Sequence, residues 1–295
     1  MVSSQNSIKG DYQMKKMTKV AVFIATSLAA SNALAADWSV TQDVTITVAA
    51  PSFEQGATGN VVSSNQALNG IVLEASDSLA VGTQTANITS STGIILTQGN
   101  QVDGATQALN LIDAHDIGSG GIVSQTVNQL GAGTTTLTQA DNAATGGNMQ
   151  AANLGIASGD VIDLDQVYAE DGDLTLVQSS VASSSNIQGV NYVEAADHIG
   201  ATGLDQSVTV DGTTSLTQGE LNVGGLNVQV GNGAVAIAGT ISKTSQAFTS
   251  AGDMGLTQSA GGIGGNNIQA VNMISAEGAG ADIGDAAAVT QTVTV

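Results

Sequence analysis

The chain has 295 residues, with 37 Gly, one Pro, no Cys and only 2% aromatic residues. Its 25 acidic and 5 basic residues give a formal net charge of −20 at pH 7. This charge argues against binding to nucleic acid, which needs a basic surface, and against attraction to anionic membranes. Without Cys there is no disulfide framework. The low aromatic content suits closely stacked strands better than a large globular core.

The first 35 residues have the pattern of a leader and a secretory signal peptide, with the true start at Met14. The stretch MKKMTKVAVFIATSLAASNALA combines a basic start, an apolar run and a small-residue cleavage site, so we expect cleavage after Ala35. The alternative is a short buried or membrane helix, but the apolar run is too short to span a bilayer. Removing residues 1–35 takes away Asp11 and four Lys, which leaves 24 acids and one Lys, a net charge of −23.

Residues 36–295 are expected to form a single repeat domain. An opening strand at 38–48 precedes six repeats of about 40 residues. The repeats lie at approximately 52–91, 92–133, 134–172, 173–212, 213–252 and 253–295. Each has three segments that alternate in the manner of a strand, as where Leu96 and Gln98 share one face and Thr97 lies on the other. Gly and Asp recur between these segments as turn residues, and very little helix is expected.

Amide residues recur at the same place in every repeat and form four columns. The first Gln column follows the word LTQ and its variants: Gln55, Gln98, Gln139, Gln178, Gln218 and Gln258. The second lies in words such as NIQAVNMI: Gln66, Gln107, Gln150, Gln188, Gln229 and Gln269. An Asn stands three residues after each of these: Asn69, Asn110, Asn153, Asn191, Asn232 and Asn272. The third Gln column begins in the opening strand: Gln42, Gln84, Gln125, Gln166, Gln206, Gln246 and Gln291.

The amide columns predict ladders inside an all-β fold. If each repeat forms one turn of a β-solenoid, equivalent residues stack roughly 4.8 Å apart. A buried amide is costly alone, but in a stack it can donate to one neighbour and accept from the other. The alternative, that these amides are exposed residues of ordinary strands, explains the alternation but not the constancy of the columns. The sequence therefore predicts a β-solenoid of about six stacked repeats that polymerises into a cross-β-like filament.

The spacing of Gln and Asn within one segment predicts a bend. In a regular strand Gln269 and Val271 would lie on one face, with Ile268, Ala270 and Asn272 on the other. One amide ladder would then be buried and the other exposed, unless the strand bends between them. Gly or another break often follows the Asn column, so we expect a bend near Asn272.

Repeats of this kind resemble the subunits of bacterial functional amyloids. Residues 38–295 are similar in pattern and composition to Fap-type fibre subunits, and more loosely to curli subunits. Curli repeats are about half as long, and their Gln-Gly-Asn-Gln pattern matches only in part, as in Gln258, Asn266 and Gln269. Fap-type subunits tend to carry a Cys pair near the C-terminus, whereas this chain has no Cys.

The resemblance implies a secreted structural subunit that assembles head-to-tail into extracellular amyloid-like fibres or fimbriae, on a bacterial cell surface or in a biofilm matrix. The first and last strands are rich in β-branched residues and carry no cap of charge, Pro or helix, so both ends are expected to be open β-edges. The expected partner is a second copy of the chain, with a nucleator subunit and an outer-membrane exporter as further partners. Six to seven rungs would give a rise of roughly 29 to 33 Å per subunit.

Enzymatic chemistry fits these residues poorly. His115 and His198 are candidates for acid–base or metal chemistry, and Asp160, Asp163 and Asp165 for calcium. The two His lie in the same turn region of different repeats, and the calcium-binding Gly-Gly-x-Gly-x-Asp repeat does not occur. We therefore expect no enzyme, with no catalytic residue, metal or cofactor.

The main alternative is a monomeric β-solenoid that acts as an adhesin or as an ice- or carbohydrate-binding surface. An ice-binding face would need several parallel columns of Thr on a flat side. The sequence has one such column, which Glu54 and Val177 interrupt: Thr97, Thr138, Thr217 and Thr257. An adhesin would more often carry a membrane anchor or a large non-repetitive tip. Imaging of the incubated chain separates the two classes.

Overall fold

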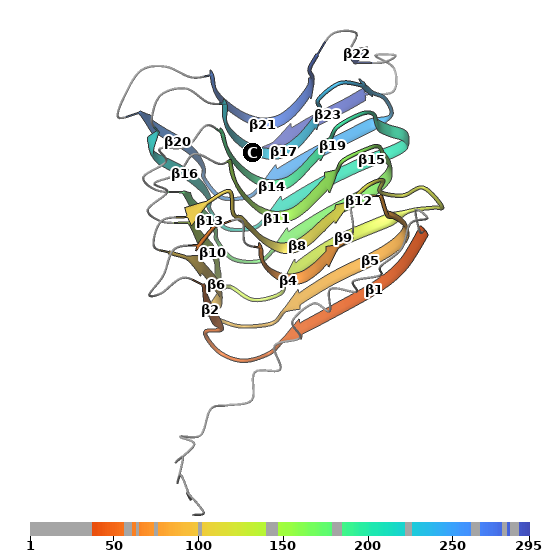
Figure 1. Cartoon of the computed structure of the whole chain (residues 1–295). Coiled ribbons are helices and arrows are strands. Elements are labelled where there is room, and N and C mark those ends of the chain that lie inside the picture. Colours follow the sequence, from red (N-terminus) through yellow and green to blue (C-terminus); the bar gives the residue numbers. More distant parts are fainter. Residues whose placement is uncertain are drawn as a thin grey trace, which may run out of the picture.

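A computed structural model describes residues 37–55, 61–62, 65–73, 76–99, 102–139, 147–178, 185–221, 226–260, 266–278, 282–283 and 289–295. These residues form an all-β structure of parallel sheets stacked along one axis (Figure 1), which confirms the predicted β-solenoid. None of the described segments is a helix long and apolar enough to cross a membrane. The expected leader and signal peptide, at 1–35, lie outside the described residues.

Three long sheets form the faces of the solenoid, and we number them I to III. Sheet I comprises β1 (Asp37–Ile46), β5 (Ser78–Ile88), β9 (Val123–Gln129), β12 (Val161–Glu170), β15 (Ile199–Val210), β18 (Thr240–Ile241), β19 (Thr244–Ser250), β22 (Asp282–Ile283) and β23 (Val289–Thr294). Sheet II comprises β2 (Ser52–Gln55), β6 (Gly93–Gln98), β10 (Thr134–Gln139), β13 (Leu174–Gln178), β16 (Thr214–Leu221) and β20 (Met254–Ala260). Sheet III comprises β4 (Asn65–Val72), β8 (Thr106–Ala114), β11 (Asn148–Ala157), β14 (Ser185–Ala195), β17 (Leu226–Ala236) and β21 (Asn266–Ala276). A small fourth sheet pairs β3 (Val61–Val62) with β7 (Val102–Asp103).

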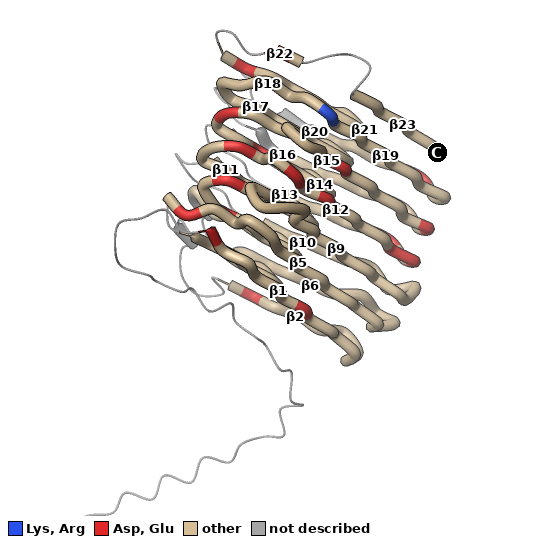
Figure 2. Tube along the Cα trace, turned by 90° about the vertical axis from the view of Figure 1, so that its right-hand side faces the viewer, with Lys and Arg blue, Asp and Glu red and all other residues tan. Residues whose placement is uncertain are grey.

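Each repeat adds one strand to sheet II, one to sheet III and then one to sheet I, except that the last two repeats each add two strands to sheet I, β18 with β19 and β22 with β23. The repeat expected at 92–133, for example, supplies β6, β8 and β9. Equivalent strands pair in parallel with equivalent residues opposite each other, so Gln84 lies between Gln42 and Gln125. The strands climb from β1 and β2 at one end to β21 and β23 at the other (Figures 1 and 2). Sequence repeats thereby become columns in space.

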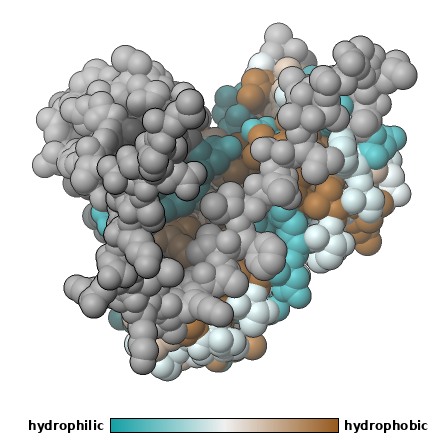
Figure 3. Space-filling model, turned by 60° about the horizontal axis from the view of Figure 1, so that its bottom comes forward, coloured by the Kyte–Doolittle hydropathy of each residue, from teal (hydrophilic) through white to brown (hydrophobic). Residues whose placement is uncertain are grey.

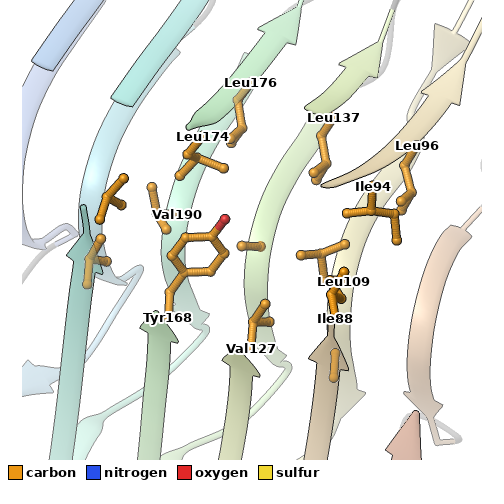
Figure 4. Close-up of a cluster of buried hydrophobic side chains, with 14 of the residues drawn as sticks. Ile88, Ile94, Leu96, Leu109, Val127, Leu137, Tyr168, Leu174, Leu176 and Val190 are labelled. Carbon is orange, nitrogen blue, oxygen red and sulfur yellow. The ribbon is translucent and has the colours of Figure 1, made fainter. Parts of the chain in front are cut away.

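Aliphatic side chains fill the narrow interior between the three sheets. Figure 4 shows part of this core, with contributions from all three sheets: Ile88, Val127 and Tyr168 from sheet I, Ile94, Leu96 and Leu137 from sheet II, and Leu109 and Val190 from sheet III. All of these residues have no exposed surface. Burying each such aliphatic side chain stabilises the fold by roughly 1.5–3 kcal/mol. A solenoid needs only a thin core, which explains how the chain manages with few aromatic residues.

Glycine allows close approach of successive turns where sheet I leads into sheet II. Gly93 has a φ of 77°, and a Cβ built on it would lie 1.9 Å from the main-chain oxygen of Thr134. A Cβ on Gly172 would lie 1.9 Å from the oxygen of Gly133, and the contact between Gly212 and Gly172 is similar. A larger residue at this corner would force the turns apart.

Candidate functional site: amide ladders and end faces

The three Gln columns form continuous ladders that all donate toward the N-terminal end. In sheet I, Gln84 Nε2 donates to Gln42 Oε1, and the same bond recurs at every step to Gln291 with N···O distances of 2.7 to 2.9 Å. The column in sheet II is bonded in the same way from Gln55 to Gln258, at 2.8 to 2.9 Å. The Gln column in sheet III is bonded in the same way from Gln66 to Gln269, with N···O distances of 2.7 to 2.9 Å.

The Asn column of sheet III runs in the opposite direction. Asn69 Nδ2 donates to Asn110 Oδ1 at 2.8 Å, and each later Asn donates to the next one toward Asn272, at 2.8 to 3.0 Å. All four predicted columns are therefore hydrogen-bonded ladders. Their opposed directions could not be read from the sequence.

Main-chain carbonyls of the neighbouring sheet set the orientation of each amide. Gln84 Nε2 also donates to the Leu111 oxygen of sheet III at 3.0 Å, and Asn110 Nδ2 donates to the Thr126 oxygen of sheet I at 3.0 Å. Gln98 and Gln107 join sheets II and III in the same way. Flipping an amide would place its oxygen against a carbonyl oxygen, so the nitrogen must face the main chain. The ladders thus connect turns along the axis and sheets around it.

Burial separates the interior of each ladder from its ends. The Gln and Asn side chains of the four ladders are at most 2% exposed in the interior turns, as for Gln166 and Asn153 at 0% and Gln206 at 2%. The alternative that these amides are exposed residues of ordinary strands is therefore wrong for the interior turns. At the last turn Gln269 and Gln291 are exposed.

The expected bend in sheet III is confirmed, and it lies just before the Asn column. The pairing of β11 with β14 joins Ala151 to Gly189 and Asn153 to Asn191, but skips Ala152. Ala152 belongs to the central core, and Asn153 also points inward, since it donates to the Val167 oxygen of sheet I. Two consecutive residues thus face the interior in both strands, and the register between the strands does not shift, so both strands bend at the same place. The regular-strand alternative, with Asn272 on the same face as Ile268 and Ala270, therefore does not hold.

Sequence reasoning missed a further ladder in sheet III. It consists of four Asn residues, each two positions before a Gln of the second column: Asn148, Asn186, Asn227 and Asn267. Their Nδ2···Oδ1 distances are 3.4, 3.0 and 2.9 Å, and each Asn donates toward the C-terminal end. The words NMQ, NIQ and NVQ carried this signal, but the first two repeats break it.

The two ends of the solenoid expose the cross-section of its core. We call the edge formed by β1, β2 and β4 the N face, and the edge formed by β20, β21 and β23 the C face. Phe53 and Leu68 on the N face, and Leu256 and Val271 on the C face, are only partly buried against the core. Their equivalents in the interior turns, such as Leu137, are fully buried. Figure 3 turns the N-terminal end forward, and apolar side chains lie there beside polar ones.

The ladders also stop at these faces with unused hydrogen-bonding groups. Within the described part of the chain, the Oε1 atoms of Gln258, Gln269 and Gln291 accept no hydrogen bond on the C face. On the N face, Gln42 Nε2 donates only to the Gly70 oxygen, at 3.0 Å. Asn69 Oδ1 accepts no hydrogen bond from any described residue.

The acids distinguish the two faces, which corrects one expectation. The N face carries Asp43 and Glu54 with exposed side chains, and Asp37 also lies on β1. Strands β20, β21 and β23 of the C face contain no charged residue, although Asp282 lies on β22 at the same end of the solenoid. The sequence predicts an N face without a charged cap. The N face instead carries acidic side chains at its edge, and charged edges of this kind limit unwanted strand pairing. Figure 2 shows the other acids spread over both strands and turns, with Asp163 and Asp205 on strands and Asp171 and Asp211 in turns.

A buried carboxyl group lies inside the solenoid, and no sequence motif marked it. Glu170 on β12 is 2% exposed, and its Oε1 accepts the Thr135 main-chain N–H at 3.0 Å. The Tyr168 hydroxyl donates to its other oxygen. Burial raises the pKa of Glu170 to about 7, although these hydrogen bonds lower it. Burial likewise raises the pKa of Glu194, which the Tyr192 hydroxyl contacts on β14.

The residues considered for catalysis or calcium mainly tie neighbouring turns together. Asp160 Oδ1 accepts the His198 main-chain N–H at 2.9 Å, and His198 Nδ1 accepts the Thr240 N–H at 2.9 Å. His115 Nδ1 lies 3.1 Å from Ser158 Oγ. Asp163 and Asp165 lie on β12, and the pKa of Asp165 is raised by burial, by Asp205 and by Asp163. Among the described residues, no three His, Asp or Glu side chains are grouped so as to hold a metal ion.

Comparisons with protein-family models, with curated proteins and with solved structures found no match for this chain. Within the described residues, the two end faces combine open strand edges, apolar side chains and unused amide groups.

Proposed function

We propose that this protein is a structural subunit that assembles head-to-tail, through its two end faces, into extracellular amyloid-like fibres of a bacterial cell surface or biofilm matrix. The observation that carries the proposal is that both faces are unfinished copies of the interior turns. Among the described strands, each interior turn is covered above and below by another turn. The end strands, β1, β2 and β4 at one end and β20, β21 and β23 at the other, pair with a described strand on one side only.

The energetics of the end faces favour addition of another copy. A docked copy would bury Phe53 and Leu68 against Leu256 and Val271, which stabilises the junction by roughly 25 cal/mol per Å² of apolar surface removed from water. It would also pair open parallel strand edges, whose N–H and C=O groups otherwise face solvent. A contact between two different faces of the same chain does not close, so repetition yields a filament.

Export and further partners belong to the same proposal. The leader at 1–35 would direct secretion, and assembly would follow outside the cell with a nucleator subunit and an outer-membrane exporter as helpers. The net charge of −23 after cleavage would keep subunits apart before assembly.

The test is to incubate the purified chain, in its full-length and exported forms, and to examine it by electron microscopy and fibre diffraction. Unbranched fibres with a meridional reflection at roughly 4.8 Å would support the proposal. Leu256→Lys on the C face should suppress fibres, while Val167→Lys, at a side chain 36% exposed on the side of sheet I, should not. Persistent monomers of the unmodified chain would contradict the proposal and favour the adhesin or surface-binding alternative.

A further inference from the structure

We propose that the N face and the C face recognise each other and reject copies of themselves. The Gln and Asn ladders run in opposite directions, and β1 and β2 of the N face carry acids, whereas β20, β21 and β23 of the C face carry none. This inference rests on the proposed function and specifies its junction. It places β23 of one copy on β1 of the next, β20 on β2, and β21 on β4. The ladders then continue across the junction from Gln291 to Gln42, Gln258 to Gln55, Gln269 to Gln66 and Asn272 to Asn69.

The unused groups of the two faces are complementary. The Gln ladders end in accepting oxygens on the C face and in amide nitrogens on the N face, since every Gln donates toward the N-terminal end. The Asn ladder ends in Asn69 Oδ1 on the N face and in Asn272 Nδ2 on the C face. Gln66 Nε2 donates to the Phe53 oxygen at 3.3 Å, whereas each later Gln of this column donates to the Gln Oε1 of the preceding turn. A head-to-tail junction therefore matches donors with acceptors in all four ladders.

Two like faces would mismatch. Two C faces bring the Gln oxygens of one copy against those of the other, and two N faces bring nitrogens together. A terminal amide cannot correct this by flipping, because its nitrogen already donates to the preceding turn, as Gln291 does to Gln246 at 2.7 Å. Turning one copy over would also make facing strands antiparallel and reverse the order of the three sheets around the axis. The parallel pairing of the interior turns could not continue.

The acids give a second, independent reason. The register of sheet I places Asp43 in the column that passes through Thr85 and ends at Thr292. The register of sheet II places Glu54 in the column that ends at Thr257. A head-to-tail junction thus sets each carboxylate beside a Thr hydroxyl, which can donate to it. Two N faces would instead crowd acids together without a compensating cation.

A charge swap tests this junction. Thr257→Glu with Thr292→Asp on the C face should slow fibre elongation about tenfold, because two like-charge pairs form at each junction. Adding Asp43→Lys and Glu54→Lys to the same chain should restore growth. The opposite change, Thr257→Lys with Thr292→Lys, should make elongation faster than that of the unmodified chain. Thr209→Asp with Val167→Glu is the matched control, since it adds the same two charges to exposed side chains of interior turns.

Elongation is measured from sheared seeds at fixed subunit concentration, with circular dichroism of each monomer as the check of folding. The inference is overturned if the unmodified chain forms fibres but the acidic C-face variant elongates equally fast, or if the charge swap does not restore growth. It is also overturned if the basic C-face variant grows more slowly. If the unmodified chain forms no fibre, the proposed function itself fails.

Discussion

Glu170 should make the solenoid less stable as pH rises through neutrality, and Glu170→Gln should remove this dependence. The carboxyl is 2% exposed, and its pKa lies at about 7 in the fold against an ordinary value of 4.5. The folded chain therefore binds this proton more tightly than the unfolded chain does. The stabilisation is complete below pH 4.5 and is lost as pH rises to about 7.

The size of the effect follows from the two pKa values of Glu170. The difference between 4.5 and about 7, at 1.36 kcal/mol per unit, gives about 3 kcal/mol. Gln stays neutral at every pH, and its oxygen can still accept the Thr135 N–H that now bonds to Glu170 at 3.0 Å. The variant should match the unmodified chain near pH 4 and exceed it by up to about 3 kcal/mol at pH 8.

Urea unfolding of the unassembled chain at several pH values between 4 and 8 measures this difference. Burial also raises the pKa of Asp113, Asp165 and Glu194, so only the variant-minus-parent difference isolates Glu170. Glu54→Gln, at an exposed position of β2, is the control and should leave the slope unchanged. A variant-minus-parent difference that is the same at pH 4 and pH 8 would refute the linkage between burial and stability.

Three further predictions concern the ladders, the core and assembly. Gln166→Leu should lower the free energy of unfolding by about 2–6 kcal/mol, because it leaves Gln125 Oε1 and a Gln206 N–H unpaired in the interior and removes a hydrogen bond to the Tyr192 oxygen. Gln291→Leu at the exposed end should cost under about 1 kcal/mol, and equal losses in urea unfolding would contradict the ladder account. Leu137→Ala, at a fully buried site, should cost about 2–5 kcal/mol by the same measurement, whereas Leu130→Ala, 57% exposed, should stay within about 0.5 kcal/mol. Fibre growth, measured by dye fluorescence, should be faster at pH 4 or with added salt than at pH 7 in low salt, because protonation or screening weakens the repulsion between acidic subunits. Slower growth at pH 4 would show that repulsion does not limit assembly.

Much of the fold could be predicted because a parallel, in-register stack converts a sequence repeat directly into a spatial column. The period of about 40 residues, the strand segments and the four amide columns all follow from the printed sequence. The bend before Asn153 was also foreseeable, since two inward-facing amides three residues apart cannot both be buried in a regular strand. The ladder of Asn148, Asn186, Asn227 and Asn267 was within reach but incomplete in the first repeats.

The tertiary structure decided what depends on neighbours from other sheets. The direction of each ladder is set by carbonyls such as those of Leu111 and Thr126, which the sequence of the ladder itself does not contain. The burial of Glu170 depends on its place at the end of β12 beside Thr135 of sheet II. The sequence by itself determined which residues stack, because stacking repeats the local pattern. The tertiary structure determined the direction of their hydrogen bonds and which of them are buried from solvent, because both depend on how the three sheets close around the core.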